Sequence, residues 1–353
     1  MRYNRTALID YCTEALMAAG ASRSEAEQTA WVLTSADERG VHSHGVMRMQ
    51  GYTACLQSGG ISGGAEYRTV SDGASYALID AGRGLGIPVS VCAAELAIRK
   101  AKVSGVAIVN VCNSHHHGAC GYYSIQMAKQ GLIGLAMSTG DIIMAAAGTA
   151  ENSIGNNPFS YAVPAGKYGN ICYDIAMSTV AMGKVAMAAD DGRCIPLGWM
   201  LDRDGNPTTD PWSYANGGTL VPFGGYKGSG LSMMVESLAG ILSGAALLKD
   251  IHAWNQDPSR GGNVGHCFLA IDPKHINPNF DVPARAEKMI TQLRAHRRVP
   301  GVERIYFPGE IEQEKEADAQ CNGIPLPPAS EHALVRTAEM TGICFDREVM
   351  RHV

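Results

Sequence analysis

The sequence predicts a layered α/β fold, and three observations lead to that prediction. Helix-like and strand-like segments alternate through the middle of the chain, and the first 58 residues carry helical patterns. Hydrophobic residues make up 46% and charged residues 18% of the 353 residues, so the chain can bury a sizeable core. A chain of this length is too long to fold around one small core, so we expect two lobes or domains.

The N-terminal part is expected to be helical. Leu8, Cys12 and Leu16 recur at helical spacing, and Ser22 or Ser24 could cap a second helix that runs to about Glu38. A third helix is expected from near Ser43 to just before Gly59-Gly60, which reads as a C-terminal stop.

The alternation follows this helical part. Apolar runs at Tyr76–Asp80, Val106–Cys112 and Leu132–Ser138 predict strands, whereas Pro88–Ser104 and Tyr122–Gln130 predict helices.

The second half of the chain has fewer elements with a clear pattern. Residues 141–230 are rich in Gly, Asn and Pro and are expected to be irregular, before a buried helix over Ser229–Leu248. A polar loop at Asn255–Gly265 precedes a strand at His266–Ile271, and residues 283–298 predict a surface helix.

Composition excludes several classes of protein. The net charge is −5 and no basic stripe is visible, which argues against a nucleic-acid partner. Glu236 interrupts the most membrane-like stretch, Leu231–Leu248, so we expect no membrane span. None of the ten cysteines forms a C-x-x-C pair, and the N-terminus has no signal-type apolar run; both favour a reducing compartment, the cytoplasm.

The segment Ser43-His44-Gly45-Val46-Met47-Arg48 is the first candidate for chemistry. On a helix, His44, Arg48 and Tyr52 would share one face, because they are spaced at i, i+4 and i+8. An imidazole can take an alcohol proton and a guanidinium can grip a carboxylate, which suits the oxidation of a 2-hydroxy acid. Arg48 would also keep His44 neutral. The alternative is a solvated polar helix face.

A histidine-rich segment, Asn113–Gly118, is the second candidate. It follows a buried strand and precedes a helix, the place where ligands gather in α/β sheets. Adjacent side chains of His115, His116 and His117 would point in different directions, so contact with a polar substrate or cofactor is favoured over a zinc site.

Two further segments have the composition of ligand loops. Pro222–Gly230 is glycine-rich, contains Lys227 and Gly228 and runs into a helix, as anion sites do, although it matches neither a P-loop nor G-x-G-x-x-G. A tight turn that packs a helix on a sheet explains it equally well. Gly155–Pro158, with Asp174–Ala176 after it, offers amide groups to a polar ligand.

Taken together, these motifs resemble one known family, the malate/L-lactate dehydrogenases of the second, non-Rossmann type. The resemblance runs over nearly the whole chain and rests on several motifs in order: SHGVMR (43–48), NSHHHG (113–118), GNNP (155–158), the D-x-A at 174–176, GWMLDRDGNPTTDP (198–211) and LVPFGGYKGSGL (220–231). It implies an unusual α/β fold, a layered α/β/α arrangement with a mixed sheet. It also implies hydride transfer to or from NAD or NADP, and a homodimer with its sites near the subunit interface.

The resemblance also implies roles for residues. Ser43 and His44 match the Ser-His pair, Arg48 the carboxylate-binding arginine, and His116 the other active-site histidine; which histidine exchanges the proton stays open. Substrate-side positions are Tyr52, Asn157 and Asp141. Cofactor-side positions are Gly140, Asp174, Ile175, Ala176, Lys227, Gly228, Tyr306, Phe307, Pro308 and Gly309. No metal is implied.

Three departures from the family pattern concern the substrate. Asn156 replaces the usual Thr, Ala145–Gly148 replaces a bulkier stretch, and Lys184 stands where the reductases of cyclic imines carry an acid. They leave the reaction class unchanged, so a small carboxylic acid is the expected substrate, with malate, lactate, ureidoglycolate and sulfolactate all open.

The sequence therefore predicts a helical dimerisation and substrate-side domain, 1–75 with 275–353, and an NAD(P)-binding α/β domain, 76–274. We expect NAD, with NADP left open. Two other classes compete with a dehydrogenase: a metal-dependent hydrolase or lyase built on His42, His44 and His115–His117, and a non-catalytic protein that keeps the fold.

Overall fold

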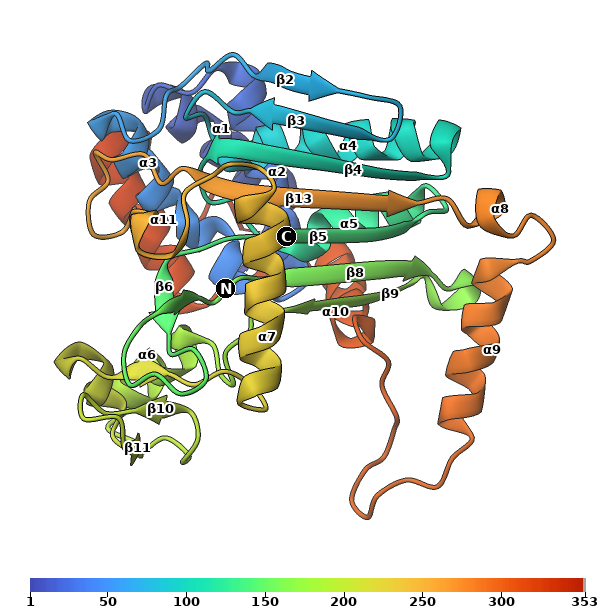
Figure 1. Cartoon of the computed structure of the whole chain (residues 1–353). Coiled ribbons are helices and arrows are strands. Elements are labelled where there is room, and N and C mark those ends of the chain that lie inside the picture. The colour runs from blue at the N-terminus through green and yellow to red at the C-terminus, as the bar shows by residue number, and fades with distance from the viewer. Residues whose placement is uncertain (352–353) are drawn as a thin grey trace.

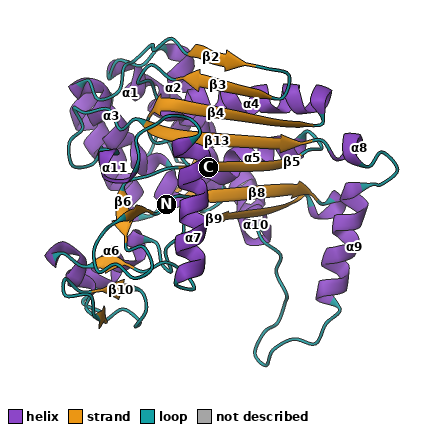
Figure 2. Ribbon diagram, viewed as in Figure 1, coloured by secondary structure: helices purple, strands orange, loops and turns teal. Residues whose placement is uncertain are grey.

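The computed structural model describes residues 1–351, and its centre is a seven-stranded sheet (Figures 1 and 2). In spatial order its strands are β2 (Arg68–Asp72), β3 (Tyr76–Asp80), β4 (Val106–Ser114), β13 (Val264–Ile271), β5 (Ile133–Ser138), β8 (Phe159–Pro164) and β9 (Asn170–Ile175). β3 and β4 run parallel, and the other neighbouring pairs are antiparallel. The predicted layered α/β fold with a mixed sheet is confirmed.

Helices cover both faces of this sheet because its central strands are apolar on both sides. On β4, Val109 and Val111 pack in the core beneath α4 (Gly86–Ser104) and α5 (Cys120–Lys129), which lie behind the sheet in Figure 1. Ile108 and Asn110 point to the other face, as the two-residue period of a strand requires. There α7 (Tyr226–Val235) and a π-helix at Glu236–Ile241 cross in front, and the Asn110 amide donates to the Leu238 carbonyl at 2.6 Å.

The two ends of the chain meet in a helical part beside the sheet. Its helices are α1 (Arg5–Ala18), α2 (Arg23–Glu38), α3 (Met49–Ser58) and α11 (Pro328–Thr341), and strand β1 (Arg2–Tyr3) pairs with β14 (Ile324–Pro325). Leu16 and Leu33 share a core with Ile324 and Leu334, which joins the termini. The domain division stays a prediction; β2, inside the range 1–75, pairs with β3 of the sheet.

The prediction that residues 141–230 are irregular is wrong in part. This stretch contains β8 and β9, α6 (Met182–Asp190) and all of a five-stranded sheet in the order β11-β10-β12-β6-β7. The strands of that sheet are β6 (Ile142–Met144), β7 (Ile154–Gly155), β10 (Met200–Leu201), β11 (Pro207–Thr208) and β12 (Thr219–Leu220). Most of them have two residues, too few for the sequence to show a period.

The third helix begins later than predicted, at Met49 rather than near Ser43. Two 3-10 turns, His42–His44 and Val46–Arg48, precede it, separated by Gly45 in an extended conformation. The Val46 amide donates to the Asp37 carboxylate instead of a helical carbonyl, so the α-helix cannot extend back through this point. The predicted spacing of His44 and Arg48 on a helix is therefore replaced by a turn.

Two other helices also differ in length from the prediction. The helix expected to reach Leu248 changes to a π-helix at Glu236 and ends at Ile241. The surface helix α9 (Val282–Arg294) ends four residues early. The remaining short helices are α8 (Pro273–Ile276), α10 (Glu310–Asn322), and 3-10 turns at Gly166–Tyr168, Pro211–Asn216 and Leu248–Asp250. Within residues 1–351, no helix is both long and apolar enough to cross a membrane.

Candidate active site

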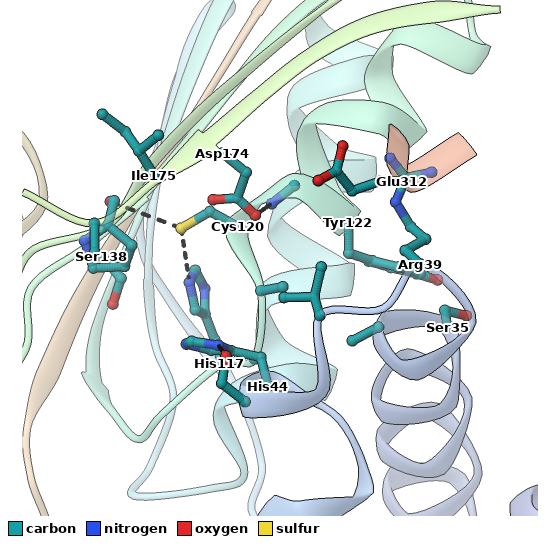
Figure 3. A pocket seen from close by; sticks show the side chains of 18 of the residues that line it. Ser35, Arg39, His44, His117, Cys120, Tyr122, Ser138, Asp174, Ile175 and Glu312 are labelled. Atoms are coloured by element: carbon teal, nitrogen blue, oxygen red, sulfur yellow. Dashed lines mark hydrogen bonds between the residues drawn. The ribbon is translucent and has the colours of Figure 1, made fainter. Parts of the chain in front are cut away.

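A pocket of about 1340 Å³ opens where the helical part meets the sheet. It lies beside the ends of β4, β5 and β9, and its walls include the loop after β4, residues 138–141 and residues 172–176. Residues of α2 and of the turn after it close the opposite side, as Figure 3 shows with Ser35, Arg39 and His44 facing Asp174 and Ile175.

The turn after α2, residues 42–48, carries three of the predicted site residues. The Ser43 hydroxyl and His44 Nδ1 lie 2.9 Å apart, and Arg48 Nε donates to the Ser43 carbonyl at 2.7 Å. This second bond uses one edge of the guanidinium and leaves its terminal nitrogens for a ligand. Ser43, His44 and Arg48 all line the pocket.

Asp37, a residue that the sequence did not point to, holds this turn from behind. Its fully buried carboxylate accepts from His42 Nδ1 at 2.8 Å and from the Val46 amide at 2.7 Å. Gly45 allows the approach, because a Cβ there would lie 2.2 Å from the Asp37 carboxylate. The pKa of Asp37 is raised by burial, and His42 and the Val46 amide oppose that rise.

His116 comes from the loop after β4 and meets His44 across the pocket wall. Their rings are stacked with centroids 5.5 Å apart, and Trp254 lies 5.7 Å from the His116 ring. The Arg48 guanidinium is also 5.7 Å from the Trp254 ring. The structure thus brings His116 to His44 and Arg48, from which it is far apart in sequence.

Both histidines are held neutral. Burial, followed by the charge of Arg48, lowers the pKa of His44 to about 3. Burial and the same guanidinium lower the pKa of His116 well below its usual range. A neutral imidazole can accept a proton, so both rings meet the first requirement of a general base.

Asp141 faces the same end of the pocket, and Asn157 holds the segment beside it. Burial raises the pKa of Asp141 to about 6, although Arg48 opposes the shift. Asn157 is fully buried; its Oδ1 accepts from the Gly140 amide at 3.0 Å and its Nδ2 donates to Glu236 at 2.8 Å. Asn157 therefore positions Gly140 and is not itself part of the pocket wall.

The pocket continues away from the histidines toward α10. Asp174, Ile175 and Ala176 line it, with the Asp174 carboxylate accepting from the Gly121 amide at 2.7 Å at the start of α5. Tyr306, Phe307, Pro308 and Gly309 line the same part, and the Pro308 carbonyl accepts from Cys172 at 2.9 Å.

Charged side chains surround this far part. Arg39 pairs with Glu316 and Arg5 pairs with Glu38 at 3.0 Å, whereas Glu312 faces the pocket beside Arg39 (Figure 3). Sequence reasoning missed these residues and Trp254, because each is an ordinary helix or loop residue until the fold places it on the wall. The only sequence feature that could have pointed to one of them is the position of Trp254, directly before the polar loop Asn255–Gly265.

Lys227 and Gly228 are not brought to this pocket. Lys227 is exposed at the start of α7, and Gly228 packs against backbone, where a Cβ would lie 2.7 Å from the Phe223 carbonyl. In the chain as described, that glycine-rich segment has the geometry of a tight turn that packs a helix closely, the second of the two interpretations.

The histidine cluster does not resemble a metal centre. Within residues 1–351, no group of three or more His, Cys, Asp or Glu side chains is placed to hold a metal ion. His117 instead contacts the Cys120 thiol at 3.3 Å and stacks on His266 at 4.3 Å.

A non-Rossmann α/β fold with a long pocket, two neutral histidines and an arginine at one end defines an enzyme suited to small acids. The family model "Malate/L-lactate dehydrogenase" matches residues 3–335, and the chain belongs to that family. Malate dehydrogenase from Pyrococcus horikoshii is 37% identical over 317 residues, 88% of this chain and 87% of that protein. A solved structure of malate dehydrogenase from that organism superposes with a TM-score of 0.88 at 34% identity, covering 97% of this chain and 96% of the other.

Two other relatives carry a cofactor in their names. Ureidoglycolate dehydrogenase (NAD(+)) of Escherichia coli is 32% identical, covering 92% of this chain and 93% of that protein. (2R)-3-sulfolactate dehydrogenase (NADP(+)) of Chromohalobacter salexigens is 36% identical, covering 82% of this chain and 86% of that protein. The predicted class, an oxidoreductase of small hydroxy or keto acids, is confirmed, and the hydrolase or lyase alternative finds no support.

Proposed function

We propose that this chain transfers a hydride between a nicotinamide dinucleotide and a small 2-hydroxy or 2-keto acid. The observation that carries the proposal is the meeting of His44, Arg48 and His116 at one end of a pocket that continues to Asp174 and Tyr306–Gly309. One end of the pocket can therefore bind the carboxylate and the C2 oxygen of the acid, and the rest of the pocket has room for the dinucleotide.

The pocket fits a dinucleotide. Its volume of about 1340 Å³ exceeds the roughly 300–1,000 Å³ of a site for one small molecule. Gly118, Ala119 and Gly121 line it at the N-terminal end of α5, so backbone without bulky side chains borders the space for the cofactor. The cofactor supplies the hydride chemistry when bound.

Arg48 is the residue that we expect to bind the substrate carboxylate. Its Nε bond to the Ser43 carbonyl fixes the plane of the guanidinium, so the two terminal nitrogens can donate to both carboxylate oxygens. Trp254 packs beside the guanidinium and excludes water on that side. His44 and His116 lie near enough to reach the oxygen on C2 and exchange its proton.

The direct test is an activity screen. Purified protein should consume NADH or NADPH with some members of a panel of 2-keto acids, followed by the loss of absorbance of the reduced nicotinamide. Binding of both dinucleotides without turnover across the panel would favour a non-catalytic member of the family.

NAD is the proposed cofactor, because acids dominate the far part of the pocket. Arg5 and Arg39 are already paired with Glu38 and Glu316, which leaves Lys129 as the remaining cation against Glu312 and Asp174. A ribose with free hydroxyls can donate to such carboxylates, whereas a 2′-phosphate would meet like charge.

We also propose a homodimer, supported by apolar side chains exposed on α7 and the π-helix that follows. Tyr226 is 74%, Ile241 64%, Leu242 55% and Met233 54% exposed, and exposed apolar side chains along one helical segment are typical of a protein–protein interface. Ile241→Glu should lower the molar mass measured by light scattering to that of a monomer, whereas Val103→Glu, at another exposed apolar residue, on α4, should not. A monomeric wild-type protein would contradict the proposal.

The cytoplasm is the proposed location. All ten cysteines are free thiols, five of them buried, which suits a reducing compartment.

A further inference from the structure

Tyr52 lies behind His116 rather than in the pocket. Its side chain is fully buried and is not part of the pocket wall, although the sequence placed it on the substrate side. Its hydroxyl is 2.6 Å from His116 Nδ1, and the ring packs 5.8 Å from Trp254. The backbone amide of Gly118 also donates to His116 Nδ1, at 3.3 Å.

These two contacts determine which ring nitrogen carries the proton. A backbone N–H can only donate, so Nδ1 must be an acceptor. Burial raises the pKa of Tyr52, which keeps its hydroxyl protonated and able to donate to the same nitrogen. A neutral imidazole with Nδ1 as acceptor carries its hydrogen on Nε2.

The neighbouring His44 is not fixed in this way. Its Nδ1 faces the Ser43 hydroxyl at 2.9 Å, and a hydroxyl either donates or accepts. His44 can therefore present a lone pair or a hydrogen at its other nitrogen, whereas His116 presents a hydrogen only.

We propose that Tyr52 is a positioning residue that, with the Gly118 amide, fixes His116 as the Nε2–H tautomer. This inference rests on the proposed function. Since Nδ1 faces Tyr52 behind the wall, the Nε2–H edge points toward the pocket and donates a hydrogen bond to the oxygen on C2 of the acid. His116 then orients and polarises that oxygen, and His44 accepts the alcohol proton in oxidation and returns it in reduction.

The test measures the tautomer directly. In ¹⁵N-labelled full-length protein without ligands, long-range ¹H–¹⁵N spectra should show His116 protonated on Nε2, with the signal assigned by its loss in His116→Gln. In Tyr52→Phe only the longer 3.3 Å contact from the Gly118 amide remains, so the His116 signals should shift part of the way toward the other tautomer. A wild-type His116 protonated on Nδ1 would overturn the inference, and this readout does not depend on any enzymatic activity.

Kinetics provide the second readout, with Tyr123→Phe as the matched control. Tyr123 is also fully buried and its hydroxyl also contacts the histidine loop, but it donates to the His117 carbonyl at 2.5 Å and not to a ring. Tyr52→Phe should lower kcat about tenfold, the effect of one lost hydrogen bond, with little change in KM for the acid.

Tyr123→Phe should leave kcat unchanged. It should lower the melting temperature by about as much as Tyr52→Phe does. Equal losses of kcat in the two variants would reduce Tyr52 to a purely structural role and overturn the inference. If neither wild type nor variant turns over any 2-keto acid, the proposed function fails, while the tautomer measurement still decides the role of Tyr52.

Discussion

At the end of the pocket where His44, Arg48 and His116 meet, both histidine segments are held by buried polar groups outside the pocket wall. Asp37 holds the turn that carries His44, and Tyr52 holds the ring of His116. At the other end, the charged side chains pair with each other at the pocket rim, as Arg39 does with Glu316. We therefore expect buried hydrogen bonds to fix the geometry of the first end, and charge to select the ligand at the second.

This difference has a physical reason. Proton and hydride transfer require reacting atoms to be held within a few tenths of an ångström, which buried hydrogen bonds can do. Binding the distant part of a cofactor contributes affinity, and exposed charges can supply that with less cost in structure. Mutations at the two ends should therefore change different kinetic constants.

Arg48→Ala should have the largest effect. It removes the carboxylate clamp, and charge-assisted hydrogen bonds of this kind correspond to about 100-fold in affinity, so KM for the acid should rise by about that factor. The KM for the dinucleotide should stay close to wild type. Steady-state kinetics with each ligand varied in turn checks this.

The matched control is Arg39→Ala at the opposite end, which should raise KM for the dinucleotide and leave that for the acid unchanged. If Arg48→Ala and Arg39→Ala both change the KM of the same ligand, the two ends of the pocket do not bind different ligands.

Asp37→Asn should have the next largest effect, because it removes the support of the rigid end without touching the pocket. An amide keeps one acceptor oxygen but cannot accept from both His42 and Val46. We expect kcat/KM to fall about tenfold and the free energy of unfolding to fall by about 1–3 kcal/mol. Denaturant melts and steady-state rates measure the two effects.

Asp10→Asn, on the exposed face of α1, serves as the comparison for a lost carboxylate and should change neither quantity. A fully active Asp37→Asn enzyme would mean that the turn keeps its shape without this carboxylate.

Glu312→Gln probes the charge-selecting end. Removal of this carboxylate should raise the ratio of kcat/KM for NADPH to that for NADH about five- to tenfold, since a 2′-phosphate no longer meets a like charge. Glu314→Gln, two residues along α10 and paired with Arg304 outside the pocket, should leave the ratio unchanged. An unchanged ratio in Glu312→Gln would place the adenosine ribose elsewhere.

The sequence predicted the main elements of the fold and pointed to residues that the structure places at one end of the pocket, but it did not indicate what holds them there. Strands such as Val106–Cys112 were visible as apolar runs, because β4 packs against helices on both of its faces. Ser43, His44, Arg48 and His116 stood out through motifs, and all four line the pocket.

Asp37 and Tyr52 gave no comparable signal of their role, since a buried hydrogen bond between segments far apart in sequence leaves no local pattern. The turn at 42–48 was mistaken for a helix for the same reason: a tertiary contact from Asp37 to Val46 replaced the helical bond that the local sequence favours.

The smallest effect concerns a histidine behind the rigid end that the mechanism does not use. His115 is 1% exposed, and neither of its ring nitrogens has a hydrogen-bond partner among the described residues. Burial lowers its pKa to about 4 from a usual value of 6.5. As the pH falls below 6.5 the unfolded chain takes up this proton first, so stability is complete above that pH and is lost between pH 6.5 and 4.

Replacement of His115 by leucine tests whether this histidine makes the protein less stable as the pH falls. Wild-type protein should lose about 1.4 kcal/mol more unfolding free energy than His115→Leu when the pH is lowered from about 7.5 to about 5.5, measured by urea melts. His332→Leu, at an exposed position on α11, should show the wild-type loss. An identical pH dependence in all three proteins would show that His115 takes up its proton as readily in the folded state as in the unfolded one, and that the packing behind the rigid end admits a charge.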